Sequence, residues 1–289
     1  MRPPEREPER KPSTIVVRER ECRSILSKSG ISRVDYAVNP YVGCAHACAY
    51  CYAVFMKRFT GHKEEWGTFV DVKVNAPAVM ARQLPRARPG SINFGTVTDA
   101  YQPLEADYGI TRGCLEALAG CPFPTTILTK SALVLRDVDL LRRIPAVEVA
   151  LTITTLDDGL RQWLEPKASP VGERLEALDA LARAGIPTWA FCGPLLPFLS
   201  DGEDELDALF AALKQARVGH VLVDSLNVRG AAWGRLRAAL GAHRPDLIAG
   251  YQALSANRVP YHTALVQRAR KAAARHDLAW REVTIAYEQ

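Results

Sequence analysis

Short β-type runs alternate with helix-type periodicities along most of the chain. The β-type runs predict strands over residues 69–74, 91–96, 125–129, 147–154, 187–193 and 220–226. The apolar spacing of the intervening stretches predicts helices over residues 76–83, 111–119, 135–143, 173–184, 204–216 and 260–276. Strands that alternate with helices favour βαβ units and a parallel sheet. About six right-handed crossovers would curl that sheet into a full or partial barrel, so the predicted fold class is α/β.

The two ends of the chain differ from its middle. Residues 1–13 (MRPPEREPERKPS) alternate charged side chains with proline and contain nothing to bury, which predicts a disordered arm. We expect an N-terminal extension over residues 14–37, the barrel over residues 38–230, and a mostly helical C-terminal extension over residues 231–289.

Composition narrows the class of protein. The 289 residues are 48% hydrophobic and 24% charged, a profile typical of globular proteins. The sequence contains no apolar run of about 18 residues and no signal-type segment at its start, so we expect a cytoplasmic protein with no membrane contact. The net charge of +5 is weak for a nucleic-acid-binding domain. Seven cysteines in a chain this long do not indicate a disulfide framework.

Three of the cysteines form a compact group. Cys44, Cys48 and Cys51 follow a C-x3-C-x2-C spacing on a loop that we place ahead of the first barrel strand, at residues 69–74. Thiolates bind zinc or iron–sulfur clusters. Three of them can hold three irons of a [4Fe–4S] cube and leave the fourth iron open for a ligand. A zinc site completed by His46 or Cys22, and three buried structural thiols, are the alternatives.

Tyr50 lies between the second and third cysteines, and C-x3-C-x-aromatic-C resembles the signature of radical S-adenosylmethionine (SAM) enzymes. Four further blocks resemble the spore photoproduct lyase-like (DNA repair photolyase-like) family: NPYVGC at 39–44, FGTVTDAYQPL at 94–104, TTILTKS at 125–131 and TITTL at 152–156. This resemblance implies a partial (β/α)6 TIM-type barrel of the radical SAM kind. It also implies a [4Fe–4S] cluster on the three cysteines, with SAM on the open iron.

The resemblance also implies an enzyme with a lyase- or transferase-like reaction. It would reductively cleave SAM to a 5′-deoxyadenosyl radical, which abstracts hydrogen from a substrate that the sequence does not identify. The implied electron donor is of the flavodoxin or ferredoxin type. The stretch 96–99 has no cysteine where a spore photoproduct lyase would carry its hydrogen donor, which argues against thymine-dimer repair. The alternatives are a nucleic-acid lesion repair or modification enzyme, and a non-catalytic structural-zinc nucleic-acid-binding protein.

Several residues are candidates to bind SAM by the same resemblance. Lys130, at the end of a predicted strand, would bind the SAM carboxylate, and its alternative is a solvated lysine. Thr98 and Asp99 would contact the amino group, and their alternative is an Asx-type turn. Tyr50 would pack beside the adenine, unless it is purely structural.

Strand alternation adds further candidates. Thr152 and Thr154 share one face of their strand, and we expect that face to line the barrel, where hydroxyls could bond SAM. Cys192 is the candidate catalytic residue, as a hydrogen donor or redox relay, against a buried inert thiol. Arg174 is expected to form a salt bridge with Glu165 or to face solvent.

Two aromatic residues and one basic stretch are ambiguous. Trp66 and Trp163 could stack on a base or ring at the open face, or pack in the ordinary way. The basic stretch 267–281 could face a phosphate backbone, but a solvated amphipathic helix face is the preferred interpretation.

Overall fold

The computed structural model describes residues 15–226, 230–256 and 258–282, and its centre is a sheet of eight strands in the order β11-β10-β9-β8-β7-β6-β3-β2. Six neighbouring strands run parallel: β3 (Tyr36–Val38), β6 (Ile92–Phe94), β7 (Thr125–Thr129), β8 (Val147–Thr152), β9 (Thr188–Leu195) and β10 (His220–Ser225). β11 (Ala279–Glu282) is parallel to β10, and β2 (Leu26–Lys28) is antiparallel to β3. The two outermost strands do not pair, so the sheet is a partial barrel, as predicted.

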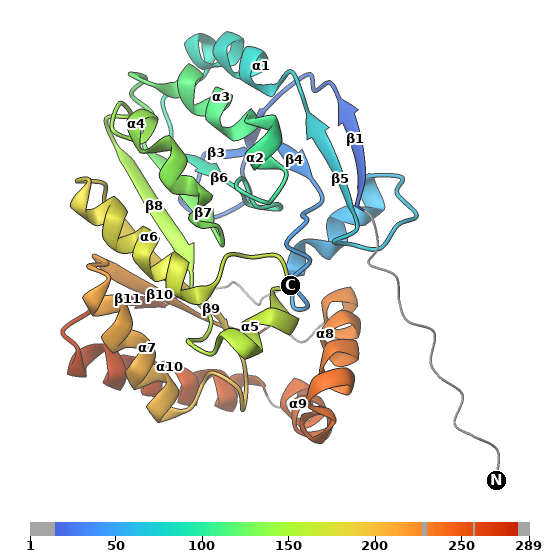
Figure 1. The fold of residues 1–289 in the computed structure, drawn as a ribbon, viewed down its shortest axis with the longest axis vertical. Helices are drawn as coiled ribbons and strands as arrows, with labels where there is room; N and C mark the ends of the chain where they lie inside the picture. Colours follow the sequence, from blue (N-terminus) through green and yellow to red (C-terminus); the bar gives the residue numbers. More distant parts are fainter. Residues whose placement is uncertain (1–14, 227–229, 257, 283–289) are drawn as a thin grey trace.

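Helices follow the parallel strands and cover the sheet (Figure 1). The covering elements are α1 (Ala76–Gln83), α3 (Ile110–Leu118), η3 (Ala132–Asp137) with α4 (Val138–Leu141), α6 (Val171–Arg183), α7 (Glu203–Gln215) and α10 (Arg258–Arg275). The shorter or peripheral elements are η1 (Tyr52–Phe59), η2 (Leu84–Arg86), α2 (Glu105–Tyr108), α5 (Asp158–Leu164), α8 (Gly230–His243), η4 (Pro245–Leu247) and α9 (Ile248–Ala256). Fully buried leucines such as Leu115, Leu178 and Leu209 form the core between helices and sheet, and each contributes about 1.5–3 kcal/mol.

Local sequence explains how α6 stops. Gly185 follows the last turn with a φ of +80°, a backbone conformation that glycine adopts without steric cost. Its N–H donates to the Ala182 carbonyl, and the Ile186 N–H donates to the Leu181 carbonyl, each at 3.0 Å. This pair of bonds is the Schellman motif, which satisfies two carbonyls in the last turn of the helix. The cap turns the chain into β9, which carries the barrel onward.

The prediction that residues 69–74 form the first barrel strand is wrong. β5 (Phe69–Lys73) pairs instead with β1 (Val16–Arg20) and β4 (Tyr41–Val42) in a separate three-stranded sheet. The first barrel strand is β3, whose three residues are too few to show a strand periodicity. The cysteine loop therefore follows the first barrel strand and does not precede it.

The remaining boundaries differ in smaller ways. Residues 135–143 form the end of η3 and the short α4 rather than one helix. The predicted barrel start at residue 38 falls at the end of β3, and β11 adds a strand to the expected helical C-terminal extension. The predicted disordered arm at residues 1–13 lies outside the described residues.

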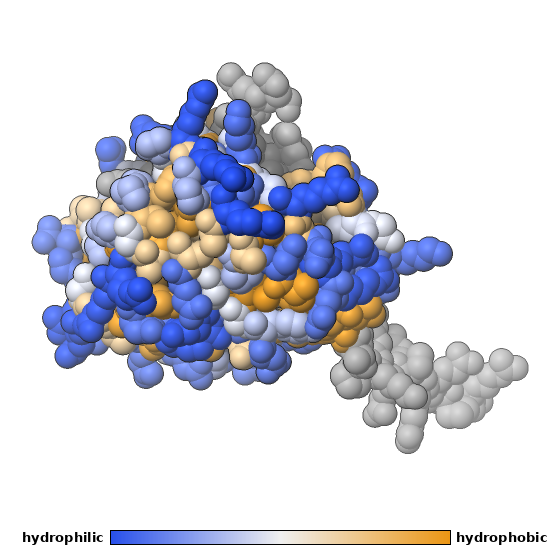
Figure 2. Space-filling view, turned by 90° about the horizontal axis from the view of Figure 1, so that it is seen from above, coloured by the Kyte–Doolittle hydropathy of each residue, from blue (hydrophilic) through white to orange (hydrophobic). Residues whose placement is uncertain are grey.

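The surface carries both hydrophilic and hydrophobic residues. Figure 2 shows long hydrophilic side chains around smaller apolar patches on the face seen from above. None of the helices in the part of the chain that the structure describes is long and apolar enough to cross a membrane.

Candidate active site

The cysteine loop begins at a turn that only glycine fits. Gly43 has a φ of +87°, and a Cβ at this position would lie 2.4 Å from the Phe69 carbonyl oxygen. Cys44, Cys48 and Cys51 follow within eight residues, the first two buried, the third half-buried, and none in a disulfide. The loop therefore brings three free thiols to the carboxyl end of the first barrel strand, where sites of parallel α/β folds lie.

The donor set fits a cluster. Burial raises the pKa of Cys48 and of Cys51, and the nearby charge of the other thiols raises both further. The three cysteines are therefore neighbours, in a site that favours the protonated thiols of Cys48 and Cys51 without a metal. Among the residues that the structure describes, no three His, Cys, Asp or Glu side chains lie close enough to hold a single metal ion, as a structural zinc site would need. Cysteines that bind a [4Fe–4S] cube each take a different iron, so this finding leaves the cluster assignment intact.

His46 does not join the cysteines as a fourth ligand. It is 2% exposed, and its Nδ1 lies 3.3 Å from Asp99 Oδ2, outside hydrogen-bond geometry but close enough for charge attraction. Burial alone would lower the pKa of His46, but the Asp99 carboxylate outweighs it and raises the pKa to about 9. The histidine is thus a loop side chain that carries a positive charge beside the cysteines.

Asp99 is already bonded within the protein. Its carboxylate accepts hydrogen bonds from Thr129 Oγ1 at 2.6 Å, and from the backbone N–H groups of Tyr101 and Lys130 at 2.8 Å each. The bond to Tyr101 makes the Asx turn that was the alternative for this residue. Burial would raise the pKa of Asp99, but His46 and these donors lower it to about 2. The Asp99 carboxylate thus joins its own turn to the end of β7. Its contact with the SAM amino group stays a prediction.

Thr98 is bonded locally as well. Its hydroxyl donates to the Gly43 carbonyl at 2.5 Å, and Gln102 Nε2 donates to that hydroxyl at 3.2 Å. Gln102 Oε1 in turn accepts the Ala45 N–H at 2.7 Å. These bonds fasten the segment that follows β6 to the cysteine loop, and the SAM contact of Thr98 stays a prediction.

A buried ion pair supports Tyr50. The Tyr50 hydroxyl donates to Glu165, whose other oxygen lies 2.5 Å from Arg174 Nη2. Arg174 also donates to the Ser169 carbonyl at 2.7 Å and to the Thr152 carbonyl at 2.9 Å. The predicted salt bridge is confirmed, and it explains an arginine early in α6. Sequence reasoning missed the link to Tyr50, because 115 residues separate it from Glu165.

Lys130 lies beside the Tyr50 ring. Its Nζ lies 5.7 Å from the centre of the Tyr50 ring. Burial would lower the pKa of Lys130, but Cys48, Glu165 and Asp99 together raise it, so the ammonium is retained. A cation held beside the cysteines suits a carboxylate ligand.

The remaining predicted site residues are buried. Thr152 ends β8 and Thr154 lies two residues beyond it, both with less than 3% exposure. Cys192 is fully buried in the hydrophobic core, and burial raises the pKa of its thiol. This placement is compatible with the inert alternative, and hydrogen donation by Cys192 stays a prediction.

The ambiguous aromatic and basic residues have structural partners. Trp66 is 2% exposed and Trp163 stacks on His243 with 5.0 Å between ring centres, so both pack in the ordinary way. Within the basic stretch, Arg268 pairs with Asp201, and Arg275 pairs with Asp207. These ion pairs agree with the preferred interpretation of a helix face.

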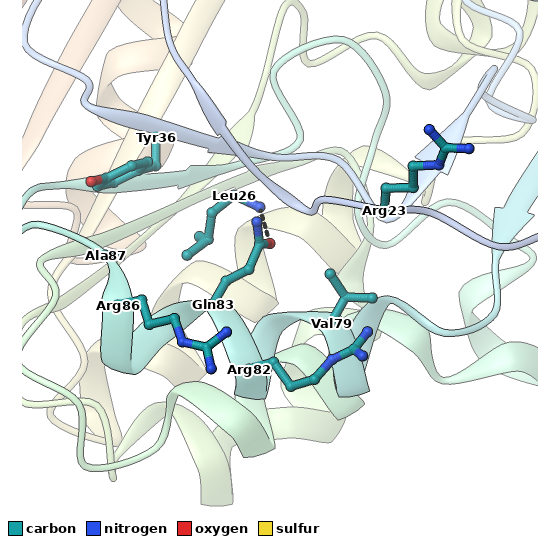
Figure 3. Close-up of a pocket in the computed structure, with 8 residues that line it drawn as sticks. All are labelled: Arg23, Leu26, Tyr36, Val79, Arg82, Gln83, Arg86 and Ala87. Carbon is teal, nitrogen blue, oxygen red and sulfur yellow. Dashed lines mark hydrogen bonds between the residues drawn. The ribbon is translucent and has the colours of Figure 1, made fainter.

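A hollow of about 480 Å³ lies elsewhere, between the end of α1 and the start of β3 (Figure 3). Tyr36, the first residue of β3, lines it together with Arg23, Arg82 and Arg86. Gln83 Oε1 accepts the Leu26 N–H at 3.1 Å across its base. The hollow is at the amino ends of the barrel strands, whereas the cysteines follow the carboxyl end of β3, so it is separate from the candidate active site.

Comparisons with known proteins agree with this geometry. The family model described as "Radical SAM superfamily" matches residues 38–212. An uncharacterized protein of Methanocaldococcus jannaschii is 36% identical over 191 residues, which are 66% of this chain and 72% of the relative. An uncharacterized protein of Mycobacterium tuberculosis is 33% identical over 253 residues, or 82% of this chain and 74% of the relative.

A solved structure shares the fold. It is a spore photoproduct lyase variant with bound AdoMet and dinucleoside spore photoproduct, which superposes with a TM-score of 0.69 at 17% identity. The match covers 93% of this chain and 82% of that one. With a [4Fe–4S] cluster and SAM as the cofactors of the superfamily, the family match and the cysteine site lead to one conclusion: the chain belongs to the radical SAM superfamily.

Proposed function

We propose that this protein is an enzyme that reductively cleaves SAM at a [4Fe–4S] cluster bound by Cys44, Cys48 and Cys51. The observation that carries the proposal is the group of three free thiols on one loop at the carboxyl end of β3. When bound, the cluster and SAM supply an electron and a 5′-deoxyadenosyl radical that takes a hydrogen atom from the substrate. A flavodoxin- or ferredoxin-type protein is the proposed electron donor.

The surrounding side chains have distinct roles in this proposal. The Lys130 ammonium binds the SAM carboxylate, because its charge is maintained by the anionic groups around it. Tyr50 presents its ring to the adenine, and its hydroxyl is fixed by Glu165. Thr152 and Thr154 offer hydroxyls from the end of β8. His46 and Asp99 hold the loop and the strand ends in register around the ligand.

The test is anaerobic reconstitution with iron and sulfide, followed by dithionite and SAM. Chromatography then measures 5′-deoxyadenosine. We expect nucleoside from the wild type and less than a hundredth as much from Cys44→Ala, Cys48→Ala and Cys51→Ala. Cys121→Ala is the matched control, because Cys121 is a half-buried free thiol outside the loop. A wild type that binds zinc in place of iron, and releases no nucleoside, would show that the proposal is wrong.

A second observation favours a nucleic acid as the substrate. Tyr52, Phe55 and Phe59 on η1 are 60%, 41% and 66% exposed, directly after the last cysteine. The Arg58 guanidinium lies 4.6 Å from the centre of the Phe59 ring and 5.7 Å from that of Phe55. Exposed rings combined with cations bind single-stranded nucleic acids by stacking and phosphate attraction. The spore photoproduct lyase structure with a dinucleoside supports the same substrate class.

Fluorescence anisotropy with a labelled single-stranded oligonucleotide tests this second proposal. Stacking contributes about 1–3 kcal/mol per base, so the Phe55→Ala/Phe59→Ala variant should bind at least about fivefold more weakly. Ile31→Ala, which truncates an exposed apolar side chain (49%) outside η1, is the control. Equal affinity of both variants and wild type would contradict the role of η1.

A further inference from the structure

Trp66 is a buried indole beside the cysteine loop whose N–H has no acceptor. The side chain is 2% exposed and packs with Cys44, Ala53 and Phe69, the last in an edge-on contact at 5.8 Å between ring centres. Among the described residues, its Nε1 is buried without a hydrogen-bond partner. An orphaned buried donor costs about 1–3 kcal/mol, so an unpaired indole N–H beside a ligand site calls for an acceptor there.

Cys51, the last cysteine of the loop, is a neighbour of this indole. A hydrogen bond from this N–H would stabilise the Cys51 thiolate, which is the form that binds iron. Cys51 also packs against the same small apolar cluster as Trp66, which holds the two side chains together.

Arg235 fastens Trp66 to the cysteine loop from a distant part of the chain. It lies on α8, which packs against η1 (Figure 1) and lies beyond the residues matched by the family model. Its Nη1 donates to the Trp66 carbonyl at 2.7 Å, and its Nη2 donates to the Ala47 carbonyl at 3.2 Å. Ala47 lies between the first two cysteines with a φ of +57°, so the loop is held in an uncommon conformation at this point.

The turn after Trp66 is packed closely against Ala47. A Cβ at Gly67 would lie 2.7 Å from the Ala47 Cβ and 3.6 Å from Arg235 Nη2. The backbone of the turn at Trp66 and Gly67 therefore contacts the cysteine loop, and the Arg235 guanidinium donates hydrogen bonds to both segments. The Arg235 guanidinium and the Trp66 indole, which come from two separate segments, therefore both contact the cysteine loop.

We propose that the Trp66 Nε1–H donates a hydrogen bond to the Cys51 sulfur when that thiolate binds the cluster, and that Arg235 positions the loop for this bond. The inference rests on the cluster assigned under the proposed function. Uptake of one electron from an external reductant makes the cluster and its thiolates more negative, with no proton transferred. A hydrogen bond to sulfur and a nearby positive charge stabilise that state, so both residues raise the reduction potential.

The experiment is a redox titration of the reconstituted protein without SAM, followed by electron paramagnetic resonance of the reduced cluster. Trp66→Phe keeps the ring and deletes only the N–H. At the wild-type midpoint we expect its ratio of reduced to oxidised cluster to fall about tenfold, a shift of about 59 mV for one electron. Trp189→Phe is the matched control, because the Trp189 Nε1 is also buried without a partner but its ring stacks on His220, away from the cysteines.

Arg235→Gln independently tests the positive charge of Arg235, because glutamine keeps N–H donors but carries no charge. It should also shift the midpoint to a more negative potential at unchanged iron and sulfide content. A Trp66→Phe protein with full iron content and the wild-type midpoint would overturn the proposal for Trp66, and an unchanged Arg235→Gln midpoint would overturn it for Arg235. If Trp66→Phe does not fold, pulsed electron paramagnetic resonance of the reduced wild type with 15N-indole tryptophan decides for Trp66: coupling of the cluster to an indole nitrogen supports the bond, and no such coupling overturns it. A wild type that takes up no iron and sulfide would refute the proposed function and this inference together.

Discussion

The buried ion pair behind Tyr50 allows a quantitative prediction. Replacing Arg174 by methionine is expected to lower the free energy of unfolding by about 3–5 kcal/mol. The guanidinium is 1% exposed, and its loss removes the 2.5 Å contact with Glu165 and the donors to Ser169 and Thr152. The fully buried Glu165 carboxylate would keep the Tyr50 hydroxyl and the more distant charges of Lys130 and Arg161. Uncompensated buried charge, rather than lost attraction, accounts for most of the cost.

The same helix provides a matched control. Arg183 pairs with Asp179 at 2.7 Å on α6, but its side chain is 64% exposed, so Arg183→Met should cost at most about 1 kcal/mol. The double variant Glu165→Met/Arg174→Met buries no charge and should be less destabilised than Arg174→Met alone. With an unfolding entropy of about 2.1 cal/mol/K per residue, 3–5 kcal/mol corresponds to a fall in Tm of roughly 5–8 °C for this chain.

Urea denaturation of the metal-free protein, followed by tryptophan fluorescence, measures these differences. Midpoints should change while the slope with urea stays constant, as two-state unfolding requires. The reasoning would be refuted if Arg174→Met cost no more than Arg183→Met. It would also be refuted if the stability lost by the double variant equalled the sum of the losses measured for Glu165→Met and for Arg174→Met. The effects of two residues in a coupled pair are not additive.

Three further predictions concern the cysteine loop. The pKa of His46 is raised to about 9 beside Asp99, so its charge stabilises the metal-free protein fully below about pH 6.5, and that stability is lost as the pH rises toward 9. Urea midpoints should follow this decline, and His46→Gln should lack it. Gly43→Ala should abolish iron uptake on reconstitution, because the new Cβ would overlap a backbone oxygen. The control is Gly61→Ala, whose Cβ would meet no atom within 4 Å. It should lower the free energy of unfolding by only about 1–2 kcal/mol and bind iron normally. Lys130→Met should weaken SAM binding at least about tenfold in equilibrium dialysis, and unchanged affinity would remove Lys130 from the ligand site.

Local patterns predicted the elements that carry their own signal. β7 and α1 have the predicted bounds, because a β-branched run and an apolar periodicity are properties of a few consecutive residues. The cysteine spacing was equally local, since all three thiols lie on one loop. The partial barrel followed from the alternation of these elements, whose crossovers have one permitted hand.

Sheet membership could not be predicted in the same way. The run at Phe69–Lys73 has the same apolar character whether it pairs with a barrel strand or with β1 and β4. Pairing depends on partners far along the chain, and β3 is too short to indicate that it leads the barrel. The cysteine loop was therefore found correctly, but it was placed on the wrong side of the first barrel strand.

The side chains that support the site were the least predictable part, for the same reason. Glu165 reaches Tyr50 across 115 residues, and Arg235 reaches the Ala47 carbonyl across 188. Neither contact leaves a trace in local spacing, and an arginine on a C-terminal helix is ordinarily solvated. Cysteine spacing identifies the chemistry because it needs only one loop. Arg235, on a helix outside the matched region, also contacts that loop where its backbone conformation is uncommon, so the C-terminal extension supports the candidate active site.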